Sequence, residues 1–388
     1  MFITLFHFHS HKPNPVYQEI SAGLRRRGHK VWVGQPNAEG NLIWQDGEKI
    51  IATLPGPFPN NIGREGNALQ RRYKYMMFML RVRAFLREQG PDIVQVNPSN
   101  MLSWVLTLGM PRECHFVLDI RQINEAVDNR LITKVKEQRD IAGMKMLASL
   151  YYEHTCFCHA GAAEKILGPG WQRNSTVVPV GIDPQFLSYN GFDLNKPDHD
   201  LVNFVYIGTL SRLRTLEQIL TAARLLKNKT TNFHLDLVGP DMTEGYYQGL
   251  IDQWGIGEVA AVRKAVPYTQ IPDILKNYDV GVAYVPDRPT WHYQPTIKVL
   301  EYRAIGLPIL STDVATHREV VRDGLNGLLV QDTPESIAAG MERFVSDPAF
   351  LQQCRKDAQL MRRGLSWDEV AKMYDEQVYC KLVMGRPL

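Results

Sequence analysis

The sequence predicts an α/β protein with two Rossmann-like halves that face a cleft. The chain has 388 residues, more than one ordinary hydrophobic core holds, so two domains are expected. Short apolar runs alternate with amphipathic stretches through the first half. The same rhythm restarts after the polar, aperiodic stretch 189–200, which is expected to be an exposed linker. Strands that alternate with helices favour parallel, doubly wound sheets.

The first half is expected to begin with a strand, because its apolar start lacks the basic leader of a signal peptide. The apolar runs predict strands at Phe2–Phe8, Lys30–Val33, Lys49–Leu54, Asp92–Asn97, His115–Ile120, Thr155–Cys158 and Thr176–Val180. The stretches between them predict helices at Val16–Arg27, Gly66–Gln89, Asn100–Leu108, Leu131–His154 and Ala160–Leu167.

The second half repeats this pattern. Its apolar runs predict strands at Val202–Ile207, Phe233–Val238, Ala260–Val266, Val280–Val285, Ile309–Thr312 and Gly327–Val330. Helices are expected at Leu216–Leu226, from near Thr296, and from Pro334 to the end of the chain. The run Ser366-Trp367-Asp368-Glu369 is similar to a capping box and predicts the start of a last helix.

The composition, with 44% hydrophobic and 22% charged residues, is typical of a soluble globular protein. No apolar run approaches the roughly 20 residues that span a bilayer. Of the five cysteines, Cys156 and Cys158 alternate along a predicted strand, which favours reduced core thiols and a cytosolic protein. Net charge is +3, but residues 1–180 contain 22 Lys or Arg and only 15 Asp or Glu. The first half is therefore expected to meet an anionic partner.

The stretch Tyr284–Val330 carries the strongest functional signal. It predicts a strand, a Pro- and aromatic-rich loop, a helix that begins near Thr296, and a further strand. Backbone N–H groups at such a helix start bind anions at the carboxyl edge of a parallel sheet. Glu301, one turn into the helix, is placed to accept hydrogen bonds from sugar hydroxyls, and an exposed helix carboxylate is the alternative. Lys298 is expected to hold a phosphate oxygen or to pair with Glu301.

This stretch resembles the donor site of the family 4 glycosyltransferases, the "group 1" set with the GT-B fold. Most members have two glutamates eight positions apart, the first contacting the transferred sugar and the second the nucleotide ribose. Glu301 matches the second glutamate, whereas Tyr293 stands at the first. A subgroup has Pro-x-Lys-x-x-Glu-Tyr instead, which is similar to the run from Thr296 to Tyr302. The resemblance implies that Thr296, Ile297, Lys298, Glu301 and Tyr293 bind the donor.

The resemblance extends over nearly the whole chain, including Leu24–Val31 and Val178–Asp183. It implies a first, acceptor-side domain at 1–184 and a second, nucleotide-sugar-binding domain at 185–365. It also implies that a C-terminal helix at 366–388 crosses back to the first domain.

The run from Gly208 to Arg214 follows a predicted strand and precedes a predicted helix. The family has a Gly here and, six positions later, a Lys that offsets the charge of the departing diphosphate. Arg214 stands at the Lys position, Arg212 is nearby, and a guanidinium can hold two phosphate oxygens. The alternative is that Arg212 and Arg214 are a solvated helix start, although two cations there oppose the helix dipole.

Two loops of the first half carry further candidates. Asp119 and Arg121 end a predicted strand where relatives contact the sugar, so they are expected to contact the sugar or the acceptor. An internal Asp–Arg pair is the alternative. Ser10 and His11 stand where relatives have two glycines beside the donor phosphate and the acceptor, and they are expected in the cleft.

No metal ion and no cofactor are expected, since the donor is itself a substrate. His7, His9 and His11 alternate along the first strand, but carboxylate partners for a zinc site are missing. Asp198 and Asp200 resemble the metal-binding Asp-x-Asp of a different glycosyltransferase fold, yet they lie in the predicted linker.

The helical stretch Arg71–Arg87 mixes basic with aromatic and apolar residues. Such a helix lies on a membrane surface or packs its apolar face on a core with its basic face in water. The relatives' lipid-linked acceptors add support to the membrane interpretation.

The resemblance implies a retaining glycosyltransferase that moves a sugar from a nucleotide-diphosphate sugar to a glycan, lipid-linked or small-molecule acceptor. A role in cell-surface polysaccharide or glycoconjugate biosynthesis is expected, in the cytoplasm or at the inner face of the membrane, with no nucleic-acid partner. The alternatives are a non-catalytic nucleotide-sugar-binding partner subunit of the same fold and a sugar-nucleotide epimerase.

Overall fold

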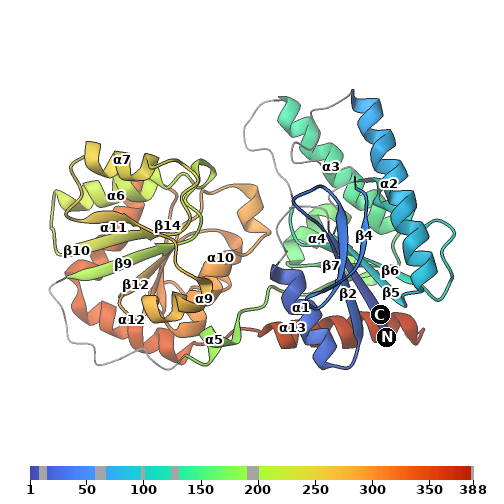
Figure 1. The fold of residues 1–388 in the computed structure, drawn as a ribbon. Helices are drawn as coiled ribbons and strands as arrows, with labels where there is room; N and C mark the ends of the chain where they lie inside the picture. The colour runs from blue at the N-terminus through green and yellow to red at the C-terminus, as the bar shows by residue number, and fades with distance from the viewer. Residues whose placement is uncertain (8–14, 57–66, 98–100, 124–130, 190–200, 386–388) are drawn as a thin grey trace. The chain divides into compact units, whose positions relative to one another are not determined.

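The computed structural model describes residues 1–7, 15–56, 67–97, 101–123, 131–189 and 201–385 (Figure 1). The chain forms two compact units. The first comprises Met1–Gly181 together with Trp367–Leu388, and the second comprises Ile182–Ser366. Each unit has a largely or wholly parallel sheet with helices on its faces, so the predicted α/β class with two Rossmann-like halves is confirmed.

The sheet of the first unit has the strand order β4-β3-β2-β1-β5-β6-β7-β8. Its strands are β1 (Phe2–His7), β2 (Lys30–Pro36), β3 (Leu42–Asp46), β4 (Lys49–Leu54), β5 (Ile93–Asn97), β6 (His115–Ile120), β7 (His154–Phe157) and β8 (Ser175–Val177). The predicted parallel arrangement holds for β1, β2 and β5 to β8, whereas β3 was missed and pairs antiparallel with both β2 and β4.

The missed strand β3 is held by its side chains. Trp44 is fully buried and stacks on Phe6 with 5.5 Å between ring centroids. A Cβ atom at Gly34 would lie 2.8 Å from the Trp44 ring, so only glycine lets the indole cover β2. Gly47, with a φ of 63°, makes the tight turn from β3 to β4.

The first unit's helices are α1 (Pro15–Arg26), α2 (Ala68–Gln89), α3 (Leu131–Leu150) and α4 (Ala160–Leu167), with a 3₁₀ helix at Met101–Thr107. The predicted helix Asn100–Leu108 is thus a 3₁₀ helix, and the predicted helix Leu131–His154 ends four residues earlier, because His154 already pairs in β7.

The C-terminal segment belongs to the first unit. It runs through α13 (Trp367–Met373), a π-helical stretch (Tyr374–Tyr379) and α14 (Cys380–Val383). Helix α13 packs closely on α1, and Gly23 allows this approach. A Cβ atom at Gly23 would lie only 2.6 Å from the Cβ of Ala371. Arg27, the residue directly after α1, adds an ion pair with Asp375 of the π-helical stretch at 2.7 Å.

The second unit has an entirely parallel sheet of order β11-β10-β9-β12-β13-β14. Its strands are β9 (Val202–Ile207), β10 (Phe233–Val238), β11 (Ala260–Arg263), β12 (Val280–Ala283), β13 (Ile309–Thr312) and β14 (Gly327–Val330). Four of them have the predicted bounds, whereas β11 and β12 end before the predicted Val266 and Val285. After β9 the chain continues to β10, toward one edge of the sheet, and after β12 it continues to β13, toward the opposite edge. This reversal creates a topological switch point between β9 and β12.

Two hydrophobic clusters cover the two faces of this sheet. Successive side chains of β9 alternate between them, with Phe204 and Tyr206 in one and Val205 and Ile207 in the other. Helices α6 (Glu217–Lys227) and α11 (Pro334–Ser346) pack together on the first face, and α9 (Ile297–Ile305) covers the second. The remaining helices are α5 (Pro184–Leu187), α7 (Tyr246–Gln253), α8 (Ile271–Leu275), α10 (Ala315–Arg318) and α12 (Pro348–Leu360).

None of the helices in the described ranges is both long enough and apolar enough to cross a membrane.

Candidate functional site

The start of helix α9 lies at the switch point of the second unit and is anchored by a buried hydrogen-bond chain. Thr296 is the N-cap residue, yet its side chain does not cap the helix. Its Oγ1 lies 3.0 Å from Nε2 of His317, whose Nδ1 lies 2.7 Å from Oγ of Ser311 on β13. Burial lowers the pKa of His317 to about 3, so this imidazole is neutral and structural. The N–H groups of the first turn therefore remain for another acceptor, beside the exposed Ile297.

Lys298, in the first turn of α9, is a buried cation without a hydrogen-bond acceptor in the described part of the chain. The residue is only 8% exposed, and its Nζ makes no hydrogen bond there. The ammonium lies 3.5 Å from the centroid of the Tyr206 ring. Burial, followed by the nearby charge of Arg214, lowers the pKa of Lys298 well below its ordinary value. Such an arrangement is costly unless an anion binds there.

Glycines at the ends of two neighbouring strands leave room around this ammonium. A Cβ atom at Gly208, where φ is 153°, would lie 3.3 Å from Nζ of Lys298. Gly239, at the end of β10, lies close to the backbone of Gly208. A Cβ atom at Gly239 would lie 2.0 Å from the Gly208 carbonyl oxygen. A side chain at Gly208 would thus crowd the ammonium, and one at Gly239 would collide with the backbone of Gly208.

The structure separates the two arginine candidates. Arg214 lies 4.5 Å from the Trp291 ring centroid, and its buried Nη1 has no hydrogen-bond partner among the described atoms. Arg212 instead is 59% exposed, pairs with Glu217 at 3.3 Å and covers the Tyr246 ring. The solvated alternative therefore suits Arg212, whereas Arg214 joins Lys298 at the start of α9.

Glu301 is buried rather than exposed, at 5% exposure. Its Oε1 accepts a hydrogen bond of 2.6 Å from the hydroxyl of Tyr268. Burial raises the pKa of Glu301 to about 7. The Tyr268 hydrogen bond, followed by the charge of Lys298, acts to lower this pKa. No sequence signal pointed to Tyr268, because the two residues are 33 positions apart and meet only through the fold.

Tyr293 is half-buried at the end of the 3₁₀ helix Pro289–His292, the element that also carries Trp291. The loop after β12 is thus close to Arg214 through Trp291.

In the first unit, the structure favours the internal alternative for Asp119 and Arg121. Asp119 is fully buried and accepts hydrogen bonds from Tyr17 (3.1 Å), Gln95 (3.1 Å) and Tyr374 (2.9 Å). Arg121 pairs with it at 3.1 Å, also donates to Tyr374, and reaches the carbonyls of Val178 and Pro179. This network ties the C-terminal segment to the sheet, and the sequence analysis missed its Tyr17, Gln95 and Tyr374.

Ser10 and His11 lie outside the described residues, as do His9, Asp198 and Asp200. His7 is buried, with Nε2 3.4 Å from the side-chain oxygen of Gln35. In the described ranges, no group of three or more His, Cys, Asp or Glu side chains is arranged to hold a metal ion.

Most of the second unit matches a known protein family. Residues 192–361 match the family model of glycosyl transferases group 1, and this segment contains Gly208, Arg214, Lys298 and Glu301. The resemblance to the group 1 glycosyltransferases is confirmed. D-inositol 3-phosphate glycosyltransferase 1 of Catenulispora acidiphila is 27% identical over 222 residues, which cover 53% of this chain and 51% of that protein. The chain spans about half the length of the curated relatives that it matches.

Solved glycosyltransferase structures confirm the GT-B fold over almost the whole chain. Sucrose-phosphate synthase of Thermosynechococcus elongatus superimposes with a TM-score of 0.70 at 14% identity, covering 99% of this chain and 100% of that one. HepE of Anabaena, solved with UDP and glucose, superimposes with a TM-score of 0.66 at 14% identity, covering 97% and 98%. At these identities the likeness concerns the fold alone.

Proposed function

We propose that this protein is a retaining glycosyltransferase that takes its donor, a nucleotide-diphosphate sugar, in the second unit. The observation that carries the proposal is the buried ammonium of Lys298, which lacks a hydrogen-bond acceptor among the described residues and lies at the start of α9. A diphosphate supplies the missing anionic acceptor. The match to the group 1 family and the UDP and glucose bound to HepE support this type of donor.

The cations of this site act on the leaving group. Charge grows on the diphosphate as the bond to the sugar breaks, and Arg214, Lys298 and the N–H groups of α9 stabilise that charge. Cationic side chains would thereby replace a metal ion. In a front-face reaction, the acceptor hydroxyl oxygen forms the new bond to the anomeric carbon. The bond to the diphosphate oxygen breaks, and the hydroxyl proton passes to a phosphate oxygen.

Glu301 binds the nucleotide rather than the reacting atoms in this proposal. Its carboxylate lies one turn beyond the phosphate-binding end of α9 and accepts hydrogen bonds from the ribose hydroxyls. Tyr293, which stands in place of the first glutamate of most relatives, would lie beside the transferred sugar. The first unit, with Ser10 and His11, would supply the acceptor side.

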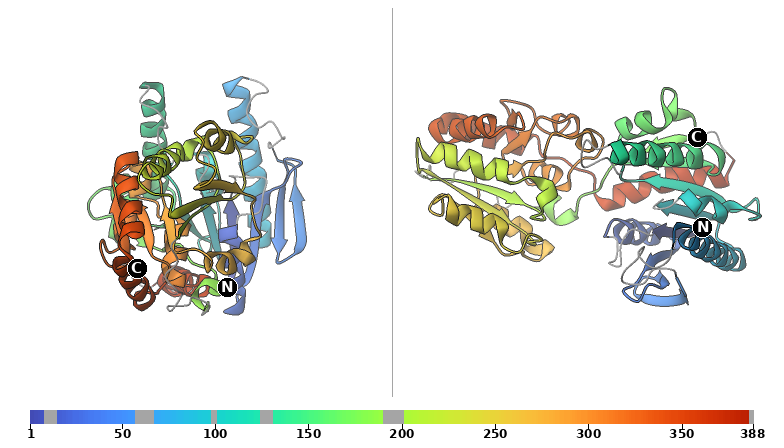
Figure 2. Two further views of the ribbon diagram at one scale, coloured as in Figure 1. Left: turned by 90° about the vertical axis from the view of Figure 1, so that its left-hand side faces the viewer. Right: turned by 90° about the horizontal axis from the view of Figure 1, so that it is seen from above.

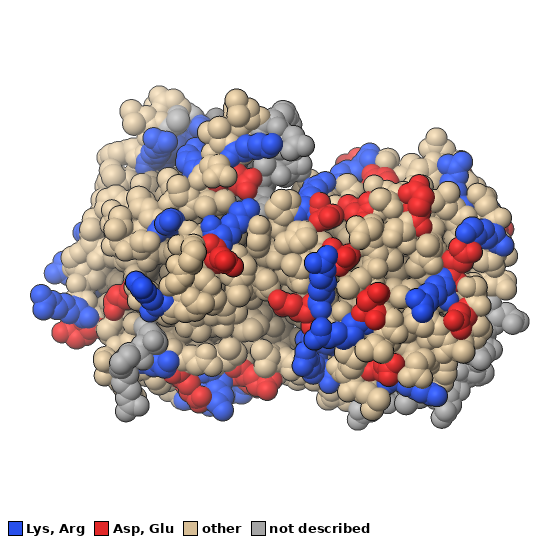
Figure 3. Space-filling view, turned by 180° about the vertical axis from the view of Figure 1, so that it is seen from behind, with Lys and Arg blue, Asp and Glu red and all other residues tan. Residues whose placement is uncertain are grey.

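A peripheral contact between the first unit and anionic lipid is part of the proposal. The start of α2 is exposed, with Tyr73 at 59%, whereas Phe78 and Met79 further along are buried. At the start of α3, Leu131 and Ile132 are each 78% exposed. Both helix starts project from the same side of the unit (Figures 1 and 2), and Figure 3 shows Lys and Arg side chains there, mostly among residues that are neither basic nor acidic. Apolar side chains between lysines and arginines fit an anionic membrane surface better than a neutral one.

Such a contact would bring a lipid-linked acceptor to the protein, which favours a role in cell-surface polysaccharide or glycoconjugate biosynthesis. Glycan and small-molecule acceptors use the same donor chemistry.

A transfer assay tests the proposed function. The protein is incubated with UDP-, GDP- and ADP-linked hexoses and with lipid-linked, glycan and small-molecule acceptors, and release of the nucleoside diphosphate is measured. Acceptor-dependent release with an α-configured product from an α-linked donor is expected. Binding without any release would favour the non-catalytic partner subunit, and a free epimerised donor or sugar would identify an epimerase.

A further inference from the structure

A hydrogen bond joins two elements of the second unit that are separate in sequence. Tyr268 begins the 3₁₀ helix Tyr268–Gln270 after β11, and its hydroxyl donates to Oε1 of Glu301 on α9 at 2.6 Å. The Tyr268 ring packs on Phe186 of α5 with 5.5 Å between centroids. Its carbonyl oxygen accepts a hydrogen bond of 3.4 Å from Gln185. The ring and the backbone carbonyl of Tyr268 are therefore both held by α5. As a result, the Tyr268 hydroxyl can keep the Glu301 carboxylate in one orientation.

We propose that Tyr268 is a positioning residue of the nucleotide site, whose hydroxyl orients the Glu301 carboxylate so that its remaining acceptor sites face the ribose. The inference rests on the proposed nucleotide-sugar donor and adds a residue to its site. An ionised carboxylate has about four acceptor sites, of which Tyr268 uses one. Within the described ranges, the hydrogen bond from Tyr268 reaches Oε1 of Glu301, which leaves acceptor capacity on the carboxylate for a diol.

The same hydrogen bond affects the ionisation of Glu301. Burial raises the pKa of this carboxyl, and Tyr268 is the largest opposing influence. Lys298 on the same helix also favours the charged form, whereas Asp183, the N-cap residue of α5, disfavours it. Loss of the Tyr268 hydroxyl would leave more Glu301 protonated at neutral pH, and a protonated carboxyl is a poorer acceptor for two hydroxyl groups.

Tyr268 has a different role if its hydroxyl merely covers the carboxylate until the ribose displaces it. In that case removal of the hydroxyl would tighten nucleotide binding, because the ribose would no longer compete with it. The two roles predict opposite signs for the same substitution.

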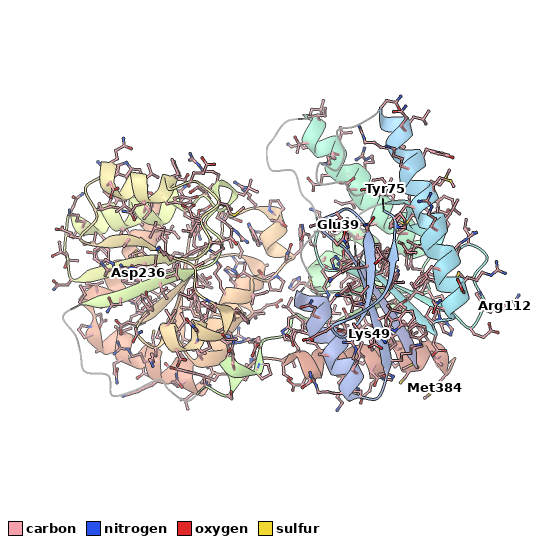
Figure 4. All side chains as sticks on the ribbon, in the orientation of Figure 1. Glu39, Lys49, Tyr75, Arg112, Asp236 and Met384 are labelled. Atoms are coloured by element: carbon pink, nitrogen blue, oxygen red, sulfur yellow. The ribbon has the colours of Figure 1, made fainter. Side chains whose placement is uncertain are left out.

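The test compares wild type, Tyr268→Phe and the control Tyr278→Phe by calorimetric titration with UDP, GDP and ADP between pH 5.5 and 8.5. Tyr278 is a matched control, because its hydroxyl donates to a different carboxylate of the unit at 2.8 Å. That carboxylate belongs to Asp236 on β10 (Figure 4). We expect Tyr268→Phe to weaken binding about tenfold at pH 7, the effect of a charge-assisted hydrogen bond, and to move the acidic fall in affinity to higher pH. Inorganic pyrophosphate should bind the three proteins equally, since it has no ribose.

Unchanged or tighter nucleotide binding by Tyr268→Phe would overturn the inference, as would an equal loss of pyrophosphate binding. Titration of the Glu301 carboxyl carbon by NMR in the unliganded protein, assigned with Glu301→Gln, gives a second readout. Its pKa should rise in Tyr268→Phe and stay unchanged in Tyr278→Phe. If wild type binds none of the three nucleotides, the proposed function fails, and an unmoved Glu301 titration would separately exclude the positioning role.

Discussion

At the residue scale, the site depends on ionisable groups whose burial in their charged form lowers the stability of the folded protein. Lys298 and Glu301 are both buried, and burial shifts the pKa of each toward its neutral form. A ligand with phosphates and hydroxyls would satisfy both groups. This combination explains why residues that cost stability stand at the start of α9.

Glu301→Gln should stabilise the unliganded protein, and more so at pH 8 than at pH 5. The folded-state pKa of about 7 lies above the ordinary 4.5, so ionisation costs the fold free energy as pH rises through this window. The full difference corresponds to about 3 kcal/mol. Urea unfolding at the two pH values measures it, and an equal effect at both would show that the carboxyl titrates normally. The same variant should bind UDP, GDP or ADP more weakly at pH 8.

Arg214→Ala should reduce turnover more than donor binding, because the charge on the diphosphate grows as the bond breaks. We expect kcat to fall about 100-fold or more, as for the loss of other groups that stabilise developing charge. Arg212→Ala is the matched control, since Arg212 is exposed and pairs with Glu217. Equal effects of the two substitutions on kcat would contradict the assignment of Arg214.

One residue-scale prediction from sequence, the start of a helix, was correct because a motif marked the position. Thr296 was expected near a helix start and is the N-cap of α9. Tyr268 and the Asp119 network could not be predicted, because their partners come from distant parts of the chain. Tyr374 is 255 positions from Asp119, and only the docking of the C-terminal segment brings their side chains together.

At the element scale, apolar runs located the strands of the second unit well, since buried parallel strands are short and continuously apolar. Strand β3 was missed although Asp46-Gly47 is a hairpin signal. The surrounding βαβ rhythm favoured a parallel connection instead. The end of α3 was placed too late, because the helical and strand patterns around His154 overlap.

The starts of α2 and α3 should bind anionic vesicles reversibly. We expect wild type to sediment with phosphatidylserine vesicles at low salt and less at high salt, because each basic side chain near the surface contributes about 1 kcal/mol that salt screens. Arg71→Glu with Arg72→Glu, and separately Leu131→Glu with Ile132→Glu, should abolish this binding.

Leu360→Glu is the control for vesicle binding, because Leu360 is an exposed apolar residue of the second unit. Wild type that never sediments with vesicles, or variants that sediment like wild type, would refute the membrane contact.

At the scale of the whole molecule, the parallel sheet of the second unit places the candidate cations, the glycines and Glu301 around one switch point. The sequence predicted the parallel sheet and its covering helices, because each strand and helix carries its own pattern. It did not predict which arginine faces the site, since Arg212 and Arg214 are two positions apart and only tertiary packing distinguishes them.

Transfer activity should survive treatment with EDTA, because Arg214, Lys298 and the start of α9 would supply the charge that a metal ion gives in other transferases. The rate of nucleoside diphosphate release is measured before and after chelation. A loss of activity that Mn²⁺ or Zn²⁺ restores would contradict this mechanism and redirect attention to His7 or to Asp198 and Asp200.

The central claim is that the start of α9 binds the diphosphate of the donor, and calorimetry of Lys298→Met tests it most directly. Wild type should bind at least one of UDP, GDP and ADP, and inorganic pyrophosphate more weakly. Lys298→Met should lose about 10-fold or more in affinity for both kinds of ligand, since a charge-assisted contact to phosphate is removed. The exposed Lys276→Met serves as the control and should bind like wild type. Equal nucleotide and pyrophosphate affinities in folded Lys298→Met and wild type would contradict the claim.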